Sequence, residues 1–494
     1  MDEWTLTEIQ NFLIHIISTQ KLPPLNIFID ALDEGEEEDV REMVAFLEEI
    51  SIRASTSHFP LRVCLSSRHW PFISVERGFS LIVEEQSAHY HDIGLYLQKR
   101  LRIDTMLNKN KLREEILSKS AGVFLWVVLV VPMLNQVYDR GGRSKEIFAK
   151  LNSIPPSLSE LFASILTKSD EGLGECALLL QWVLYAKRPL SPHELCRALG
   201  YLDVNADEED SLAAVFNSDE NSDDWNPEAK FSTLFGIKSS SIPPVGPSER
   251  FLLYCSRGLV EPTKSTPRVV QFIHETVGGY LRDSATAISL PNVGQKLAEN
   301  VFDFELGTCS AVIAQGCLQY LLALCEKGIR YASAELLFIF PLAEYAAKFW
   351  WQHAKSADIT ERPELMDLAM RLIMGHDFWR DFWLQCCAFG EAKHSGTWRV
   401  ASIAYCAAFT GIPAIVAEVI RRKADINALG GRCGTALQYA SAQGYTEIVR
   451  ILLESGADAS ATGGHCGSAA QAASYHGHTE VANFSRDSTV KRKS

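Results

Sequence analysis

The feature of this 494-residue sequence that most constrains its fold is a repeat of 33 residues near the C-terminal end. Gly434–Ser441 aligns with Gly467–Ser474 at that spacing. Each segment reads as a helix of small residues, which lets neighbouring units stack closely. Three glycines that would end these helices recur at the same interval: Gly411, Gly444 and Gly477. We therefore expect stacked units with two short helices each.

A period of 33 residues with this helix pattern resembles the ankyrin repeat. We place the repeats at 398–484 and a polar tail at 485–494. Ankyrin repeats imply protein partners. No polar capping unit is visible, and about three repeats are the minimum for stability. We therefore expect either that the stack leans on the preceding helices or that the chain is a truncated gene product.

Composition excludes several other classes of protein. The net charge is −14 and no lysine/arginine stripe stands out, so no nucleic-acid partner is expected. The cysteines are scattered without metal-ligand spacing, and we expect no zinc, haem or flavin. The N-terminus lacks the pattern of a signal peptide, which predicts free thiols and a cytoplasmic location.

One apolar stretch, Ala121–Val137, has to be weighed as a membrane span. Pro132 and the following Asn135-Gln136 pair shorten its apolar run to about a dozen residues, whereas a spanning helix needs about 20. A buried core helix is the preferred interpretation and a membrane helix is the alternative. No membrane partner is expected.

The N-terminal region predicts a parallel α/β unit. A helix over 5–20 precedes a short strand over 25–29, which ends at Asp30. An acidic helix over 36–50 leads to a second strand over 61–65. Strand, helix and strand within about forty residues are typical of a right-handed parallel crossover.

The rest of the chain predicts mostly helices. Residues 93–201 have helical periodicity, and 203–249 are acidic and rich in serine and asparagine, as in a linker or insertion. The apolar runs 251–254 and 269–273 suit a β-hairpin followed by a helix. Helices return over 293–383.

Three acidic residues follow the first strand: Asp30, Asp33 and Glu34. Ligands of open α/β sheets bind beyond the carboxyl ends of strands, and Mg²⁺ prefers oxygen ligands. An acid at the strand end suits Mg²⁺–nucleotide, and a further acid could polarise the attacking water. The alternative is an ordinary acidic helix N-terminus.

Arg68 follows the second strand, so its side chain would emerge at the same sheet edge as Asp30. A guanidinium there could reach a γ-phosphate. The alternative is a surface arginine at a strand end.

These residues resemble a known family. The string IFIDALDE, Ile27–Glu34, looks like the Walker B segment of NACHT-type STAND NTPases, and CLSSRHWP, Cys64–Pro71, like their sensor-1 strand. Further segments similar to fungal members follow in the family's order: Asp92–Leu101, Lys119–Val127, Leu151–Leu161, Leu178–Leu195, Phe272–Val277 and Phe340–Lys348.

The resemblance implies a mixed α/β fold followed by mostly α: a partial P-loop NTPase sheet, helical and winged-helix domains, and an ankyrin stack. The implied boundaries are a partial NACHT core at 1–90, a helical domain at 91–170, a winged-helix-like domain at 171–290 with the insertion 203–249, and a helical connector at 291–397.

Site residues are carried over from the family position by position. Asp30 matches the acid that holds Mg²⁺ through water, Asp33 and Glu34 match the catalytic acidic pair, and Arg68 matches sensor 1. His274 matches a winged-helix histidine that touches the β-phosphate of ADP. Its alternative is a histidine at a strand–helix junction bonded to backbone. The next polar residues of the family are replaced by two glycines, Gly278-Gly279, which should weaken that helix.

The main departure from the family is the phosphate-binding loop, because the sequence contains no Gly-Lys dipeptide. We expect feeble binding of Mg-ATP or Mg-ADP and no hydrolysis. The preferred function is a STAND/NACHT-type signalling regulator in fungal self/non-self recognition or defence, truncated and impaired, with possible self-oligomerisation. The alternatives are an ankyrin binding module with a decayed NTPase core and an active ATP/GTP hydrolase.

Overall fold

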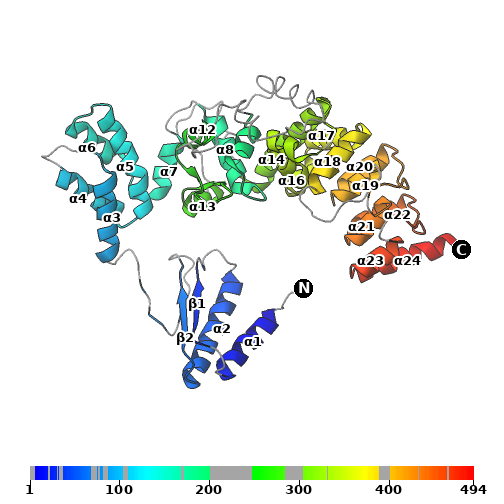
Figure 1. Cartoon of the computed structure of the whole chain (residues 1–494), viewed down its shortest axis with the longest axis horizontal. Coiled ribbons are helices and arrows are strands. Elements are labelled where there is room, and N and C mark those ends of the chain that lie inside the picture. The colour runs from blue at the N-terminus through cyan, green and yellow to red at the C-terminus, as the bar shows by residue number, and fades with distance from the viewer. Residues whose placement is uncertain are drawn as a thin grey trace, which may run out of the picture. The chain divides into compact units, whose positions relative to one another are not determined.

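The computed structural model (Figure 1) describes most of the chain. The described residues are 6–19, 23–30, 32, 37–67, 75, 78–79, 81, 87–103, 109–167, 172–200, 247–283, 304–330, 332–388, 401–431, 433–463 and 467–493. They fall into two compact units, residues 1–151 and 152–494. Each unit is described by itself.

The first unit begins with two helices and two strands: α1 (Leu6–Thr19), β1 (Leu25–Ile29), α2 (Glu37–Thr56) and β2 (Leu61–Leu65). β1 and β2 are parallel and pair from Leu25 with Leu61 to Ile29 with Leu65. The predicted strand–helix–strand unit is therefore present. α2 extends six residues beyond the predicted end because Ile50 and Ala54 continue its buried face.

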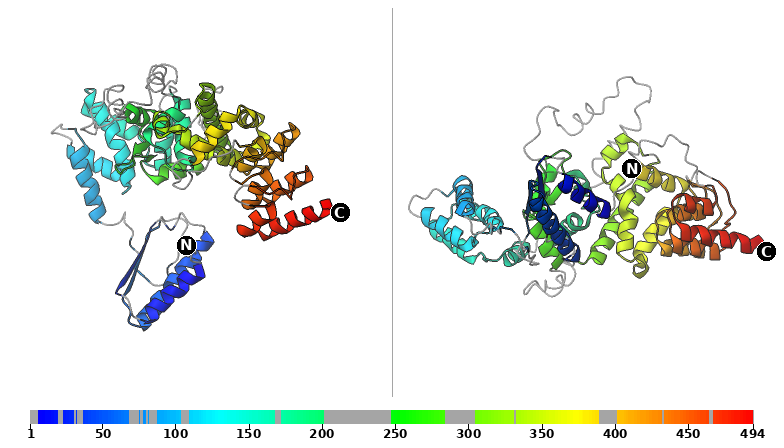
Figure 2. Two further views of the ribbon diagram at one scale, coloured as in Figure 1. Left: turned by 45° about the vertical axis from the view of Figure 1, so that its right-hand side comes forward. Right: turned by 90° about the horizontal axis from the view of Figure 1, so that it is seen from below.

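Among the described residues of the first unit, the core packs against one face of this sheet. α1 and α2 lie on the same side of the strands (Figure 2), and a core containing Ile17, Leu47 and Ile50 packs against the inward side chains of both strands. Side chains alternate along β1, so Phe28 points the other way and is 79% exposed. The opposite face is open at Phe28 and at its partner on β2, Cys64.

Four described helices follow: α3 (Ser87–Arg100), α4 (Lys109–Ser120), α5 (Phe124–Asp139) and α6 (Ser144–Ser153), whose last two residues lie beyond the unit boundary. α5 contains the apolar stretch that was weighed as a membrane span. It is 16 residues long with Pro132 inside, and Trp126, Val127 and Val130 are fully buried. A buried helix is therefore correct for this segment.

The second unit opens with a helical region that carries a small hairpin. Its elements are α7 (Leu158–Leu166), α8 (Leu173–Tyr185), α9 (Pro192–Ala198), α12 (Pro247–Cys255), β3 (Val260–Pro262), β4 (Val270–Phe272) and α13 (Glu275–Asp283). β3 and β4 are antiparallel, with Val260 opposite Phe272. The Val270 N–H also donates to the Leu190 carbonyl at 2.8 Å, so the segment before α9 lies beside β4.

The predicted first hairpin strand was wrong. Residues 251–254 lie inside α12, and the hairpin uses β3 instead. Leu252 and Cys255 are buried three residues apart while Tyr254 is 79% exposed, which is a helical pattern. A run of four apolar residues cannot distinguish the helical period of about 3.6 residues from the strand period of about two. Most of the predicted insertion, 203–246, lies outside the described residues.

A helical connector follows: α14 (Leu306–Glu326), α15 (Ala334–Ile339), α16 (Leu342–Ser356), a 3₁₀ turn η4 (Ile359–Glu361), α17 (Pro363–Met374) and α18 (Asp377–Ala388). Among the described residues, α14 is the one helix long and apolar enough to cross a membrane by length and composition. It packs against α16 and α17, and 56% of its apolar window is buried, as in the core helix of a folded domain.

The repeats form three helix pairs: α19 (Ile403–Phe409) with α20 (Pro413–Arg421), α21 (Ala436–Ala442) with α22 (Thr446–Glu454), and α23 (Ala469–Tyr475) with α24 (Thr479–Lys493). Gly411, Gly444 and Gly477 have φ of +66°, +71° and +82°, the left-handed conformation that glycine tolerates at a helix end. α24 continues to Lys493 with no glycine or proline to end it, so the predicted polar tail, 485–494, is helical as far as that residue.

An aromatic seam joins the connector to the first two repeats. It consists of Trp350 and Trp351 on α16, Trp383 on α18, Phe409 on α19 and Tyr439 on α21. The Trp383 ring centroid lies 5.5 Å from Trp350 and 5.6 Å from Phe409, and Phe409 lies 5.5 Å from Tyr439. The first repeat therefore packs on the connector, as expected if the stack leans on the preceding helices.

Candidate functional site

The residues after β1 and β2 meet at one edge of the sheet. The Ser66 N–H donates to the Ile29 carbonyl at 2.9 Å, and the Leu32 N–H donates to the Ser66 carbonyl at 3.0 Å. The Ser66 hydroxyl donates to the Asp30 carboxylate. The parallel register therefore places Asp30 beside the segment that follows β2, where a ligand of an open α/β sheet would bind.

Three of the predicted site residues, Asp33, Glu34 and Arg68, lie outside the described residues. Asp30 is hydrogen-bonded to Ser66, two residues before Arg68. The magnesium, catalytic and phosphate-binding roles of these four residues stay predictions.

His274 lies between β4 and α13 in the second unit, and its side chain is exposed. Its Nδ1 accepts the Thr276 N–H at 3.2 Å and lies 2.8 Å from the Thr276 hydroxyl. This is the backbone-bonded junction histidine of the alternative interpretation. Because Nδ1 accepts, the ring proton belongs on Nε2, which no described residue contacts. Despite Gly278 and Gly279, α13 is helical through Asp283.

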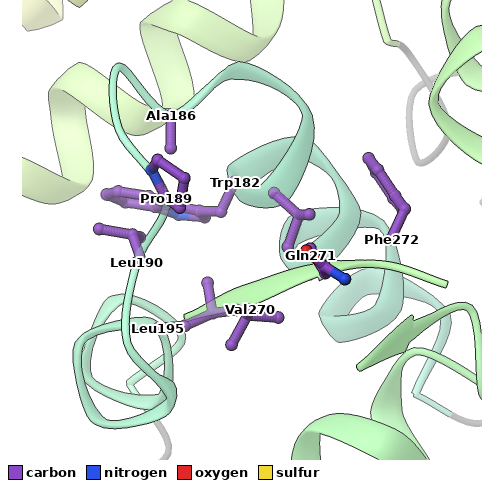
Figure 3. Close-up of a pocket in the computed structure, with 9 residues that line it drawn as sticks. Trp182, Ala186, Pro189, Leu190, Leu195, Val270, Gln271 and Phe272 are labelled. Carbon is purple, nitrogen blue, oxygen red and sulfur yellow. The ribbon is translucent and has the colours of Figure 1, made fainter. Parts of the chain in front are cut away.

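A small apolar cavity opens beside this region (Figure 3). Its volume is about 180 Å³, and it lies between α8, the segment that leads into α9, and β4. Apolar side chains surround it, and one amide side chain, Gln271, comes from β4. The main lining residues are Trp182, Pro189, Leu190, Leu195, Val270 and Phe272.

Next to the cavity lies a cluster that the sequence did not predict, the Tyr345 cluster: Lys187, Arg188, Glu194, Tyr345 and His353. The Lys187 N–H donates to the Tyr345 hydroxyl at 2.9 Å, and that hydroxyl lies 2.8 Å from His353 Nε2. Arg188 pairs with Glu194 at 2.5 Å and covers the Tyr345 ring at 5.2 Å. The cluster fastens the α8–α9 segment to α16.

His353 is fully buried in this cluster. Burial, and secondarily the charge of Lys187, lowers the pKa of His353 to about 3. The ring is therefore neutral near pH 7. The Tyr345 hydroxyl accepts the Lys187 N–H and forms a second hydrogen bond with His353 Nε2.

The contact between the second and third repeats depends on Gln438, which is 1% exposed. Its Oε1 accepts the Thr435 N–H at 2.7 Å and completes the N-terminal capping box of α21. Its Nε2 donates to the Ala461 carbonyl at 3.2 Å and also to the Gly467 carbonyl in the next repeat. One side chain thus caps its own helix and holds the neighbouring turn.

Gln438→Ala should therefore lower the free energy of unfolding of the repeats by about 2 kcal/mol, because partly buried carbonyls and the buried Thr435 N–H lose their partner. Urea unfolding followed by circular dichroism and by hydrogen exchange of α21 and α23 measures the loss. Gln471→Ala, at the equivalent but exposed position, is the matched control. Equal effects of the two substitutions would contradict the role assigned to Gln438.

Comparison with known protein families confirms the predicted ankyrin repeats. Residues 437–484 match the family model of ankyrin repeats in many copies. The chain is also 29% identical over 206 residues to the vegetative incompatibility protein HET-E-1 of Podospora anserina. That match covers 38% of this chain and 14% of the relative's length. The chain thus carries ankyrin repeats at its C-terminal end and resembles part of a fungal vegetative incompatibility protein.

Proposed function

We propose that this chain is part of a fungal signalling regulator of the NACHT type, in which a nucleotide-responsive core is joined through helical domains to ankyrin repeats that bind protein partners. The observation that carries the proposal is the parallel pair β1–β2, with Asp30 bonded to the segment that follows β2. Its similarity to HET-E-1 and its ankyrin repeats support the same conclusion.

The region from α8 to β4 supports a winged-helix assignment. Its order is helix α8, an extended segment at Leu190, helices α9 and α12, and the hairpin β3–β4. The hydrogen bond from the Val270 N–H to the Leu190 carbonyl places this segment beside β4, in the position of a third strand. His274 follows directly after this hairpin, where the family resemblance assigns a contact with ADP.

For the first unit, we propose that Asp30 holds Mg²⁺ through water and that Arg68 contacts phosphate. For His274, in the second unit, we keep the phosphate contact that the family resemblance implies. Asp33 and Glu34 would polarise water if the core hydrolyses nucleotide. The given residues contain no Gly-Lys dipeptide of a phosphate-binding loop, so we propose that they bind Mg-ATP or Mg-ADP weakly by themselves. Possible self-association and a cytoplasmic location belong to the same proposal.

Titration of Mg-ATP and of Mg-ADP against the thermal stability of the full chain tests the nucleotide core. At a ligand concentration ten times Kd, binding adds about 1.4 kcal/mol to the stability of the unit that binds. We expect a rise in Tm at millimolar nucleotide that Asp30→Ala removes. Glu49→Gln, which changes an exposed carboxylate on α2, should keep the rise.

The second candidate function is an ankyrin binding module whose core no longer binds nucleotide. The contacts of Gln438 favour this function, because they hold the second repeat to the third within the described residues. The same titration separates the two functions, because no change in Tm up to millimolar nucleotide would exclude the switch and leave the module.

A further inference from the structure

The cavity beside β4 has an apolar floor and a mouth that opens to solvent. Its floor contains Trp182, Leu195 and Val270, which are 1%, 0% and 4% exposed. Pro189 and Gln271 also line it but are exposed, so they mark its mouth. Protein interiors are normally packed without voids of this size, because the side chains around a void lose dispersion contacts. A ligand that fills about 180 Å³ here would restore those contacts.

One wall of the cavity is a flat aromatic ring that α14 and α16 hold in place. Figure 3 shows the indole of Trp182 along this wall, opposite Leu195 and Val270. The ring centroid of Tyr345, on α16, lies 5.8 Å from that of Trp182. A Cβ built on Gly316, on α14, would lie 3.5 Å from the indole. A fixed aromatic face favours a planar ligand, because aromatic rings attract each other in offset-stacked or edge-to-face contact.

A polar group stands at the mouth of this apolar space. The side-chain amide of Gln271 has no hydrogen-bond partner among the described residues. An amide NH₂ donates to an acceptor such as a ring nitrogen. Apolar walls with a small number of polar groups are typical of sites for small organic molecules, in which the polar groups fix the orientation of the ligand.

We propose that this cavity binds a small planar aromatic molecule of two fused rings with a hydrogen-bond acceptor at its edge. An apolar cavity of about 150 Å³ accepts benzene, so a volume of about 180 Å³ suits a larger ring system. The rings would lie against Trp182, and the acceptor would face Gln271. The site is separate from the proposed nucleotide contacts, because Asp30 belongs to the first unit and His274 does not line the cavity.

Binding in the cavity would stabilise the contact between the α8–α9 segment and α16. Pro189 and Leu190 line the cavity and lie in the same segment as Lys187, whose N–H donates to the Tyr345 hydroxyl. The Leu190 carbonyl accepts the Val270 N–H from β4. A ligand packed between these walls would restrain both hydrogen bonds. Hydrogen exchange of the Lys187 and Val270 amides should therefore slow when the ligand is bound.

Titration of the full chain with quinoline, in the absence of nucleotide, tests the site. We expect saturable binding with a Kd of about 0.1–1 mM, as for other ligands of about ten non-hydrogen atoms. Naphthalene has the same shape without the ring nitrogen, and it should bind about fivefold more weakly because one hydrogen bond is missing. Gln271→Leu, an exposed substitution that the fold should tolerate, should remove this difference. Saturation-transfer NMR measures each Kd.

A matched pair of substitutions locates the binding. Ala186→Leu extends a side chain into the cavity from the end of α8 and should weaken quinoline binding about tenfold or more, and its φ of −57° and ψ of 136° accept leucine. Ala198→Leu, at a half-buried position of α9 outside the cavity lining, should keep the binding. Thermal unfolding shows whether both variants are folded.

Three results would overturn the proposal. Quinoline that does not saturate the natural chain, or that binds folded Ala186→Leu equally well, would rule out the cavity as the site. Equal binding of quinoline and naphthalene would remove the hydrogen bond at Gln271. Unchanged exchange of the Lys187 and Val270 amides at saturating quinoline would show that the ligand does not stabilise the contact with α16.

Discussion

Replacing Trp383 with alanine is expected to lower the free energy of unfolding at the junction of connector and repeats by about 3–5 kcal/mol. The side chain is fully buried, and its indole N–H donates to the Ala347 carbonyl at 3.0 Å. It is the centre of the aromatic seam, in contact with Trp350, Trp351 and Phe409. Alanine would leave a cavity that three other aromatic rings cannot fill.

The loss should appear on both sides of the seam. Hydrogen exchange at increasing denaturant is the measurement, because it reports the opening of α16, α18 and α19 separately. Trp383→Phe should cost less, since a ring remains but the hydrogen bond is lost. Tyr475→Ala, on an exposed aromatic, is the matched control. A Trp383→Ala protein in which α19 keeps its protection would show that the connector does not support the repeats.

Acid is expected to weaken the contact between the α8–α9 segment and α16 well before carboxylates titrate. The pKa of His353 is lowered to about 3 in the fold, and its ordinary value is about 6.5. Below pH 6.5 the unfolded chain binds a proton that the folded chain does not. The neutral His353 ring therefore makes its full contribution to the free energy of unfolding above pH 6.5. Below that pH the free energy of unfolding falls by about 1.4 kcal/mol per pH unit, which is about 2 kcal/mol at pH 5.

His353→Gln tests the origin of this loss. The amide oxygen can still accept from the Tyr345 hydroxyl but does not titrate, so the slope of stability between pH 6.5 and 5 should become shallower. Some slope should remain, because burial also lowers the pKa of His193. Measuring urea unfolding of α16 at several pH values gives the slope, and His476→Gln, an exposed histidine, should not change it. An unaltered slope in His353→Gln would rule out His353 as its source.

The parts that the sequence predicted well are those specified by local signals. Pro23-Pro24 and Asp30 bound the first strand, and its short apolar run supplies the side chains that pack on the core. The repeat glycines were predictable because each requires a positive φ at one position of a fixed period. The hairpin strand was misplaced because a four-residue apolar run fits either period.

The Tyr345 cluster could not be predicted, because its members are far apart in the sequence. The bond from Lys187 to Tyr345 spans 158 residues. Both residues lie in segments that resemble the family, but nothing in either segment indicates that the two meet. The same is true of the aromatic seam, whose tryptophans read individually as ordinary core residues. At the candidate site, sequence and structure agree on the edge that carries Asp30, which follows from a parallel register alone.

The half-covered β1–β2 sheet has a practical consequence for anyone preparing this protein. Phe28 and the thiol of Cys64 stand side by side on a bare surface, and within the described residues the two strands pair only with each other. Bare strand edges recruit further strands, and an accessible thiol can crosslink what has been recruited. Fragments limited to 1–90 should precipitate or oxidise on storage, and reductant together with Cys64→Ser should prolong their shelf life.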